Sequence, residues 1–466
     1  MTDIPQGKKA VTLMLFVIAF ATLMDGLDGG IVNVALPVLA KDFGTDTGTI
    51  AWITVVYFIM IAGLMIPFAR IAKNGNIKKV LFIGLIIFTA SSFLCGISDN
   101  FQMLLAFRAI QGIGAAMMGA ATPMICVRYL PTQSLGLGLG VLTLGSSIGF
   151  AAGPALGGII TDVLSWHWIF LINIPLGLLV LPLLFKAIPN DEKIPKQDLD
   201  LTGAVLLFMV IMFGALALER ASYGGDKLLV LVSAAVFLVS ITAFILTELK
   251  KRHPILNIRV FTHKRFDAVF VAFLLINVAY MGMIYLLPFY MNNTMDFSSS
   301  TSGAFLLIPP VITLVFCIPI SKWSDVSGRR WFSVTACVMM LIAFASMAMF
   351  SDRGMTLPLI LTLTCMGFVW AFCGGPMASR IVEEVSDESR EIGSTLMNES
   401  IYIGATVGVA LFAMIFTLGS GAGNVEFADL SSEIFLDGFT LSMITGVLIS
   451  LTALIASFVI KDRSAR

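Results

Sequence analysis

Fourteen long apolar stretches limit how this chain can fold more than any other feature. Each is about 20 residues or longer with few charged side chains, enough for one helix to cross a hydrocarbon core of about 30 Å. In lipid, every backbone polar group must be hydrogen-bonded within such a segment, so we predict an all-α membrane protein with fourteen transmembrane helices. The stretches lie near 12–38, 50–72, 79–98, 102–126, 134–161, 167–187, 201–220, 228–248, 267–291, 301–321, 331–350, 355–379, 391–419 and 437–460.

The composition agrees with a lipid environment. Hydrophobic residues make up 58% of the chain and charged residues 12%, whereas soluble domains carry about 25% charged residues. The formal net charge is zero, so nothing indicates a nucleic-acid partner. The six cysteines, mostly within apolar stretches, and three scattered histidines lack metal-site spacing, so we expect no metal and no cofactor.

Basic residues in the connecting loops predict the orientation. If the N-terminus lies inside the cell, the loops on the outer side carry only Lys41, Arg220, Lys227 and Arg353, and most other basic residues lie on the inner side. Such an excess marks the cytoplasmic side. The first apolar run continues to about Leu39 and is longer than the roughly 7–15 residues of a cleaved signal. We therefore expect a multi-pass protein of the cell membrane with both termini in the cytoplasm.

Two polar stretches divide the spans into groups of six, two and six. The first is Pro189–Asp200, and the second is the basic stretch Lys250–Arg265. We predict an N-terminal six-helix bundle at 1–188, a linker with two additional helices at 189–264, and a C-terminal six-helix bundle at 265–466. This arrangement suits a transporter with two related halves around a midplane site, and we expect it to act as a monomer in the lipid bilayer.

Two acids lie within the first span. Asp25 and Asp28 are three residues apart, so they share one face of a helix. A charged carboxylate at bilayer depth costs on the order of 3 kcal/mol or more unless it is paired or faces water. Either acid is a candidate for handling protons or substrate. The alternative is that one of them only pairs with a cation, or caps a bend at Gly29-Gly30.

Arg108 in the fourth span is a candidate partner for these acids. It lies seven residues after Phe101, roughly 10 Å from the outer end and at about the depth of Asp28. Since an arginine keeps its charge in nearly any environment, it needs a carboxylate, carbonyls or water there. A purely structural ion pair is the alternative. Glu399 in the thirteenth span is a third buried acid, and it could serve as a proton site, bind a cationic substrate or pair locally.

The fifth span has a glycine pattern that predicts close packing against a neighbouring helix. Glycines at four-residue spacing form a groove, and a proline inside the span kinks it. The G-x-x-x-G-P-x-x-G-G pattern consists of Gly149, Gly153, Pro154, Gly157 and Gly158.

Four blocks carry a resemblance to a known family: Leu27–Pro37, Leu104–Ala116, Gly149–Gly158 and Trp166–Gly177. Over essentially its whole length the chain resembles the major facilitator superfamily, and within it the fourteen-span drug:proton antiporter family. The resemblance implies that Asp28 is the family's first-span carboxylate, Arg108 the arginine linked to proton transfer, and Gly153-Pro154 the element of exporters. It also implies a cavity lined by the first, fourth, ninth and twelfth spans, with the candidates Asn33, Asn277, Tyr280, Tyr285 and Trp370.

The loop after the second span departs from the family pattern. Lys73 stands where the family has an acid that faces the start of a second-half helix and favours the outward-open state. A lysine would repel the positive end of that helix. One hypothesis is a charge-swapped latch between Lys73 and the acidic segment Glu383–Glu391, and the alternative is solvated surface charge. The corresponding loop of the second half keeps the pattern better, with Asp325, Gly328, Arg329 and Arg330.

The resemblance implies a proton-coupled antiporter that exports amphipathic, often cationic, drugs by alternating access. Its partners would be protons and a small-molecule substrate. A second hypothesis keeps the scaffold but exports a specific metabolite, such as an amino acid or peptide, because a fold does not determine a substrate. A third is a membrane sensor without transport or a membrane-embedded enzyme. The chain has no nucleotide loop, metal cluster or nucleophile–base set, so we expect no enzyme.

Overall fold

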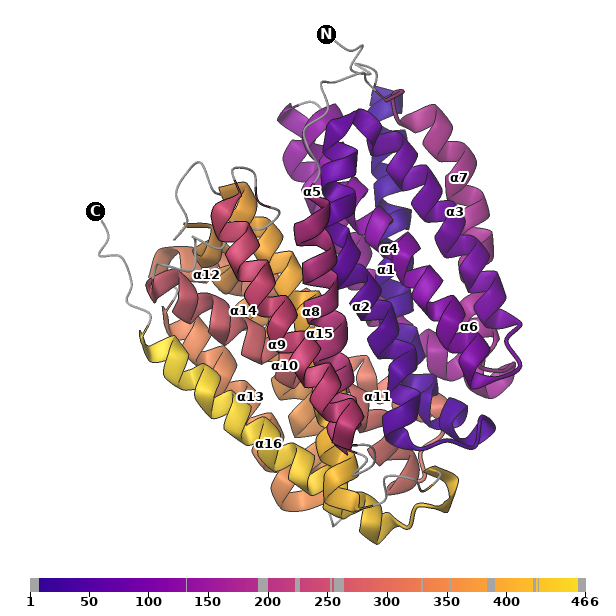
Figure 1. Ribbon diagram of the computed structural model, residues 1–466, viewed down its shortest axis with the longest axis vertical. Coiled ribbons are helices and arrows are strands. Elements are labelled where there is room, and N and C mark those ends of the chain that lie inside the picture. Colours follow the sequence, from indigo (N-terminus) through magenta and orange to yellow (C-terminus); the bar gives the residue numbers. More distant parts are fainter. Residues whose placement is uncertain are drawn as a thin grey trace.

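A computed structural model describes residues 8–130, 132–191, 200–222, 227–251, 254, 264–327, 330–351, 354–383, 390–421, 425 and 427–459. These residues are almost entirely helical, with no strand among them (Figure 1). The helices are α1 Lys8–Asp42, α2 Thr47–Ile71, α3 Ile77–Gly96, α4 Phe101–Tyr129, α5 Thr132–Val163, α6 Trp168–Leu171, α7 Asn173–Ala187, α8 Leu201–Ser222, α9 Lys227–Lys250, α10 Lys264–Asn293, α11 Ser299–Leu306, α12 Ile308–Ser327, α13 Arg330–Phe350, α14 Thr356–Glu383, α15 Arg390–Ser420 and α16 Ser432–Val459.

Within the described residues, thirteen helical stretches are long and apolar enough to cross a membrane. One of them, Thr47–Gly96, runs for 50 residues and contains both α2 and α3. Helical geometry breaks inside it at Asn74 and Gly75, where Gly75 has a φ of 89°, a conformation that glycine adopts without strain. The predicted all-α membrane architecture is confirmed, while the count of fourteen spans remains a prediction.

The long helices pack in two groups. In the first group, α1–α7, α1 packs along α5, and α4 contacts both α2 and α3. In the second group, α10–α16, α10 contacts α15 and α16, and α14 contacts α12 and α13. Figure 1 shows the first group in indigo to magenta and the second in salmon to yellow. The proposed domain boundaries at 188/189 and 264/265 remain predictions.

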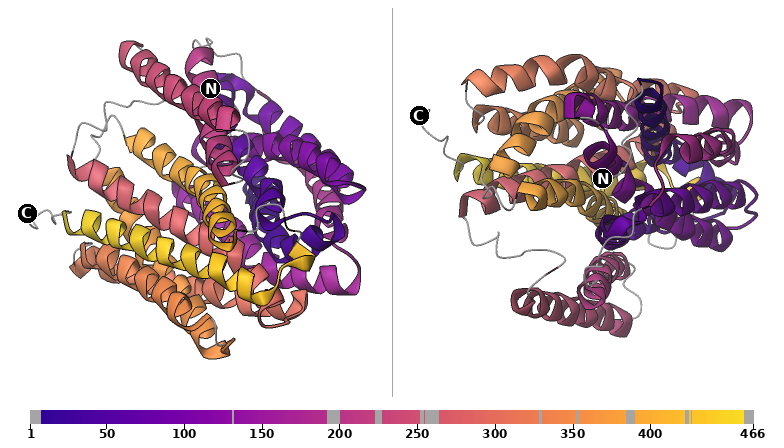
Figure 2. Two further views of the ribbon diagram at one scale, coloured as in Figure 1. Left: turned by 60° about the horizontal axis from the view of Figure 1, so that its bottom comes forward. Right: turned by 90° about the horizontal axis from the view of Figure 1, so that it is seen from above.

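The two additional helices form a pair beside both groups. α8 and α9 pack together, and α8 contacts α2 of the first group and α15 of the second. Viewed from above, the pair lies at the edge of the molecule (right panel of Figure 2). Asp200, just before α8, accepts hydrogen bonds from the Gly203 N–H at 2.7 Å and from Lys251. Burial by itself raises the pKa of Asp200, but these bonds outweigh it and hold the pKa below the usual carboxyl value.

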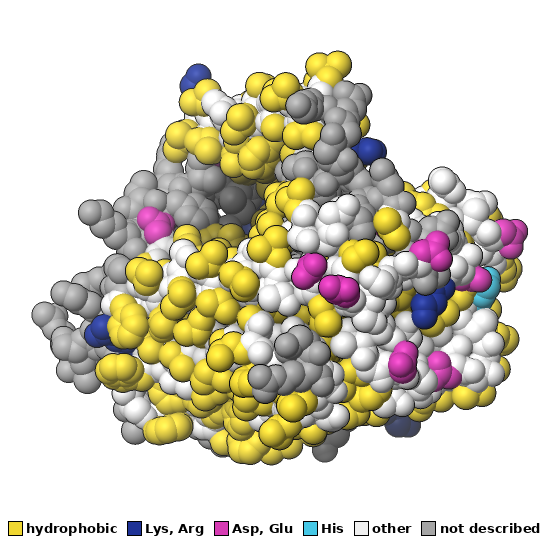
Figure 3. All heavy atoms as spheres, turned by 90° about the horizontal axis from the view of Figure 1, so that it is seen from below, with side chains coloured by type: hydrophobic (Ala, Val, Ile, Leu, Met, Phe, Trp, Pro, Cys, Tyr) yellow, Lys and Arg dark blue, Asp and Glu magenta, His cyan; other side chains and the backbone are white. Residues whose placement is uncertain are grey.

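The two groups meet at the end of the molecule where α1 finishes and α2 begins. We call this the outer end, following the predicted orientation. Here the Phe427 N–H donates to the Thr45 carbonyl at 3.1 Å, and the Tyr285 hydroxyl donates to the Thr47 carbonyl. Figure 3 looks at this end and shows hydrophobic side chains over much of it, with charged side chains scattered among them. Contacts between the groups therefore close the outer end.

Candidate functional site

Asp28 lies at the centre of a fully buried polar network. Its Oδ2 is 2.5 Å from Nη1 of Arg108, so the partners expected from their similar depth do form an ion pair. Its Oδ1 accepts hydrogen bonds from the side-chain amides of Gln111 at 2.9 Å and Asn173 at 3.3 Å. Asp28 is 0% exposed. Since all three partners donate, Asp28 acts only as an acceptor, which is the role of an ionised carboxylate.

Arg108 is as fully enclosed as its partner. It is 1% exposed, its Nε donates to the Ile53 carbonyl at 3.1 Å, and its Nη1 also reaches Oε1 of Gln111 at 2.8 Å. Its guanidinium carbon lies 4.1 Å from the centre of the Tyr57 ring, a cation–π distance. A buried ion pair is tolerated when further hydrogen bonds satisfy its remaining donors and acceptors, and the bonds from Arg108 to Ile53 and Gln111 serve this purpose.

Asp25 has a different environment, although it lies on the same helix. It is at the midpoint of α1, roughly one turn inward of Asp28, and it is half-buried. The Tyr57 hydroxyl donates to its Oδ1 at 3.2 Å, and the Tyr402 hydroxyl donates to its Oδ2 at 3.3 Å. Tyr57 belongs to α2 of the first group and Tyr402 to α15 of the second. Asp25 is thus held by both groups at once.

The predicted cavity residues lie in three kinds of place. Tyr280 and Trp370 are half-buried and meet edge to face, with ring centres 5.8 Å apart. Asn33 and Asn277 are buried, and each donates to the carbonyl four residues earlier in its own helix. Tyr285 is fully buried in the outer contact with α2. A role of these five residues in binding substrate remains a prediction.

Glycines of α5 let α1 approach unusually closely. A Cβ added at Gly149 would lie 2.5 Å from the Leu27 nitrogen, and one added at Gly153 would lie 2.9 Å from the Ile31 nitrogen. These are backbone atoms, which cannot move aside cheaply. Gly157 has the same role, with a distance of 2.6 Å to the Ile31 carbonyl oxygen. The glycine pattern therefore sets the position of the helix that carries Asp25 and Asp28.

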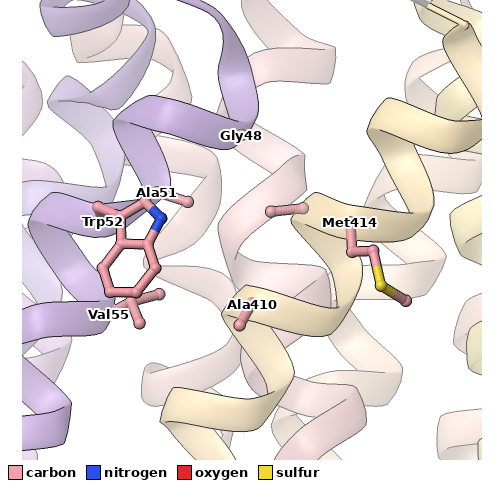
Figure 4. A pocket seen from close by; sticks show the side chains of 7 residues that line it. Gly48, Ala51, Trp52, Val55, Ala410 and Met414 are labelled. Carbon is pink, nitrogen blue, oxygen red and sulfur yellow. The ribbon is translucent and has the colours of Figure 1, made fainter. Parts of the chain in front are cut away.

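A small pocket opens between α2 and α15, nearer to the outer end than Asp25. Figure 4 shows Trp52 and Met414 on the two facing helices. No side chain in its lining is acidic or basic, so it offers no counter-charge for a charged group. The polar residues around Asp25 and Asp28 are the stronger candidate site. The pocket is lined by Gly48, Ala51, Trp52, Val55, Ala410, Ala413 and Met414.

Some predicted residues fall outside the described part of the chain. They are Gly328, Arg329 and the side chains of Asp325, Glu399 and the acidic segment 383–391. Lys73 is exposed in the turn between α2 and α3, and Nη2 of Arg330 donates to the Phe458 carbonyl at 3.2 Å. A latch between Lys73 and the acidic segment thus remains a prediction.

Sequence reasoning missed several partners of these acids. Gln111 stands three residues after Arg108 on the same helix face, and Asn173 lies within the last of the four motif blocks, so a local signal existed for both. Ser92, which accepts from Gln111 at 2.8 Å, gave no such signal. Tyr57 and Tyr402 are far from Asp25 in the chain and could be assigned only once the helices were placed.

Comparisons with known proteins agree with the fold and the motifs. Residues 18–409 match the Major Facilitator Superfamily. The putative multidrug resistance protein MdtD of Pectobacterium carotovorum subsp. carotovorum is 27% identical over 461 residues, covering 98% of this chain and 97% of that protein. The riboflavin transporter RibZ of Clostridioides difficile is 25% identical over 411 residues, covering 88% and 89%.

A solved structure is similar across nearly the full length. It is a bacterial homolog of the human lysosomal transporter Spinster, with a TM-score of 0.70, 16% identity and 97% coverage of both chains. At that identity the likeness concerns the fold alone. The match of the family to most of the chain is the stronger finding. This chain belongs to the Major Facilitator Superfamily, and it is a multi-pass membrane transporter rather than an enzyme.

Proposed function

We propose that this protein is a proton-coupled antiporter that exports amphipathic, often cationic, compounds, and that Asp25 takes up and releases the proton. One observation carries the proposal. Asp25 is a half-buried carboxylate at the midpoint of α1, hydrogen-bonded by hydroxyls from both helix groups. An ionisable residue at membrane depth is by default a candidate for proton or substrate handling.

The partners of the two acids favour Asp25 over Asp28 as the proton carrier. A proton on Asp28 would meet only donor groups and would leave the buried guanidinium of Arg108 without its counter-charge. The hydroxyls of Tyr57 and Tyr402 can donate to a carboxylate or accept from a carboxylic acid. Asp25 can therefore change its charge with its partners in place, while Asp28 stays in its ion pair with Arg108.

Protonation of Asp25 would act on the contact between the two groups. Hydrogen bonds to a charged group contribute about 1.5–3 kcal/mol, and neutral ones about 0.5–1.5 kcal/mol. Loading the proton thus weakens the bond between Asp25 and Tyr402 and biases the equilibrium of alternating access. The half-buried aromatic rings of Tyr280 and Trp370 suit an amphipathic cation. The name of the relative MdtD supports drug export.

Everted membrane vesicles with a quenched pH-sensitive dye test the proposal. We expect ethidium to reverse the quenching with the wild type and not with Asp25→Asn. Asp42→Asn is the matched control, because Asp42 lies on the same helix but at its outer end, where it accepts from the Trp166 indole at 2.7 Å. Asp42→Asn should behave as the wild type. If Asp25→Asn transports ethidium as the wild type does, Asp25 is not the proton carrier.

A second candidate function is transport of a specific metabolite. The relative named as a riboflavin transporter favours it, since it matches 88% of this chain. The same vesicles distinguish the two functions when riboflavin, amino acids and ethidium are added in turn. Reversal by riboflavin or by an amino acid alone would select the metabolite transporter, and reversal by ethidium selects the drug exporter.

A further inference from the structure

A charged contact joins the two groups at the outer ends of α5 and α11. Asp162, the next-to-last residue of α5, accepts a hydrogen bond at 2.7 Å from the backbone N–H of Ser300, in the first turn of α11. Asp162 belongs to the first group and α11 to the second. The carboxylate therefore bridges the groups.

This carboxylate acts as part of the helix cap. The first N–H groups of a helix have no partner within the helix and form its positive end, so an acceptor with negative charge stabilises them. The Ser298 hydroxyl, which directly precedes α11, accepts a hydrogen bond from the Thr301 N–H at 3.2 Å. The Ser300 N–H finds its acceptor in Asp162, which belongs to the other group. The cap of α11 is thus complete only while the groups are closed at the outer end.

The backbones on either side of this cap are in close contact. A Cβ added at Gly158 of α5 would lie 2.2 Å from the Ser299 carbonyl oxygen, and one added at Gly303 of α11 would lie 2.2 Å from the Pro154 carbonyl oxygen. Neither helix can slide past the other without separating. Separation of the groups here removes the acceptor from the Ser300 N–H.

We propose that Asp162 is an outer latch, which stabilises the outer-closed state by capping a helix of the opposite group. Replacing an N-cap side chain by alanine typically shifts an equilibrium roughly five-fold, within a range of about two- to thirty-fold. Asp162→Ala should shift the balance toward the outward-open state by that factor. Asp162→Asn should shift it about two-fold, because asparagine still caps but lacks the charge. The latch requires alternating access but not proton coupling.

Hydrogen–deuterium exchange with mass spectrometry on the purified full-length protein tests the latch. The informative signal is remote: the Phe427 N–H, whose acceptor is the Thr45 carbonyl of the other group. With the latch, Asp162→Ala should raise exchange about five-fold both there and in the first turn of α11. Asn100→Ala is the matched control, because Asn100 caps α4 through the Met103 N–H at 2.9 Å within the first group. It should leave exchange at Phe427 unchanged.

If Asp162→Ala speeds exchange only in α11, Asp162 is a local cap and the latch is overturned. If Asn100→Ala speeds exchange at Phe427 as much as Asp162→Ala does, the latch is also overturned. If Asp162→Ala does not fold, Asp162→Asn provides the test. We then expect about two-fold faster exchange both at Phe427 and in the first turn of α11. No change at Phe427 would count against the proposal. The measurement needs neither a proton gradient nor a substrate. Its outcome is thus independent of the Asp25 vesicle experiment.

Discussion

The substitution Asp28→Asn should destabilise the protein strongly, because it breaks a buried ion pair. It leaves the guanidinium of Arg108, which is 1% exposed, without a counter-charge. It also places a donating amide where Gln111 and Asn173 both donate. Removing one partner of such a pair costs about 3–5 kcal/mol.

The double variant separates the ion pair from its surroundings. Arg108→Met alone leaves Asp28 charged and buried with only two amide partners, so it should also cost several kcal/mol. In the double variant Asp28→Asn with Arg108→Met, neither charge of the buried pair remains. Its loss of stability should therefore be smaller than the sum of the single losses by about 2–3 kcal/mol.

Titration of the purified variants with denaturant in detergent measures these free energies of unfolding. Asp25→Asn is the comparison on the same helix. We expect it to cost less than about 1 kcal/mol, because Asp25 is half-buried and its tyrosine hydroxyls can reorient around an amide. If Asp28→Asn loses less than 1 kcal/mol, or if the two single losses simply add, our account of the network is wrong.

Three further outcomes are expected. Gly153→Val should cost about 1–3 kcal/mol by overpacking α5 against α1, lowering the yield of folded protein; a wild-type yield would contradict the contact at Ile31. Tyr402→Phe removes one hydrogen bond to Asp25, so the pH profile of ethidium export in vesicles should shift, and an identical profile counts against its role. Because its pKa is lowered, Asp200 contributes stability at neutral pH that disappears as the pH falls below about 3.9. Lys251→Met should therefore speed hydrogen exchange at the start of α8 at neutral pH, and the difference from wild type should vanish in acid.

Much of the fold could be predicted from the sequence because the bilayer imposes a length on each apolar stretch. Helix type and the approximate bounds follow from that length alone, as the agreement between 267–291 and Lys264–Asn293 shows. Depth along each helix follows as well. This is why the sequence predicts that Arg108 meets Asp28 or Asp25, and the structure pairs it with Asp28, 80 residues away.

Close packing of α5 against a neighbouring helix was also predicted from the sequence, and the structure identifies that neighbour as α1. Glycines at four-residue spacing leave a groove wherever the helix lies, and the neighbouring backbone fills it at Gly149 and Gly153. The direction in which each remaining side chain points was not accessible, because rotation of a helix about its axis depends on every helix packed around it.

The bonds that join the two groups arise only from the arrangement of the helices in space. Asp25 and Tyr402 are 377 residues apart, and Asp162 and Ser300 are 138 apart. No local sequence pattern identifies Tyr402 or Ser300 as a partner of these acids, because hydroxyls and backbone N–H groups occur throughout the chain and the carboxylate comes from a distant helix. An apolar stretch specifies a helix and the depth of its residues through its own hydration free energy. Which residues at that depth become neighbours is decided by how the two groups pack against each other.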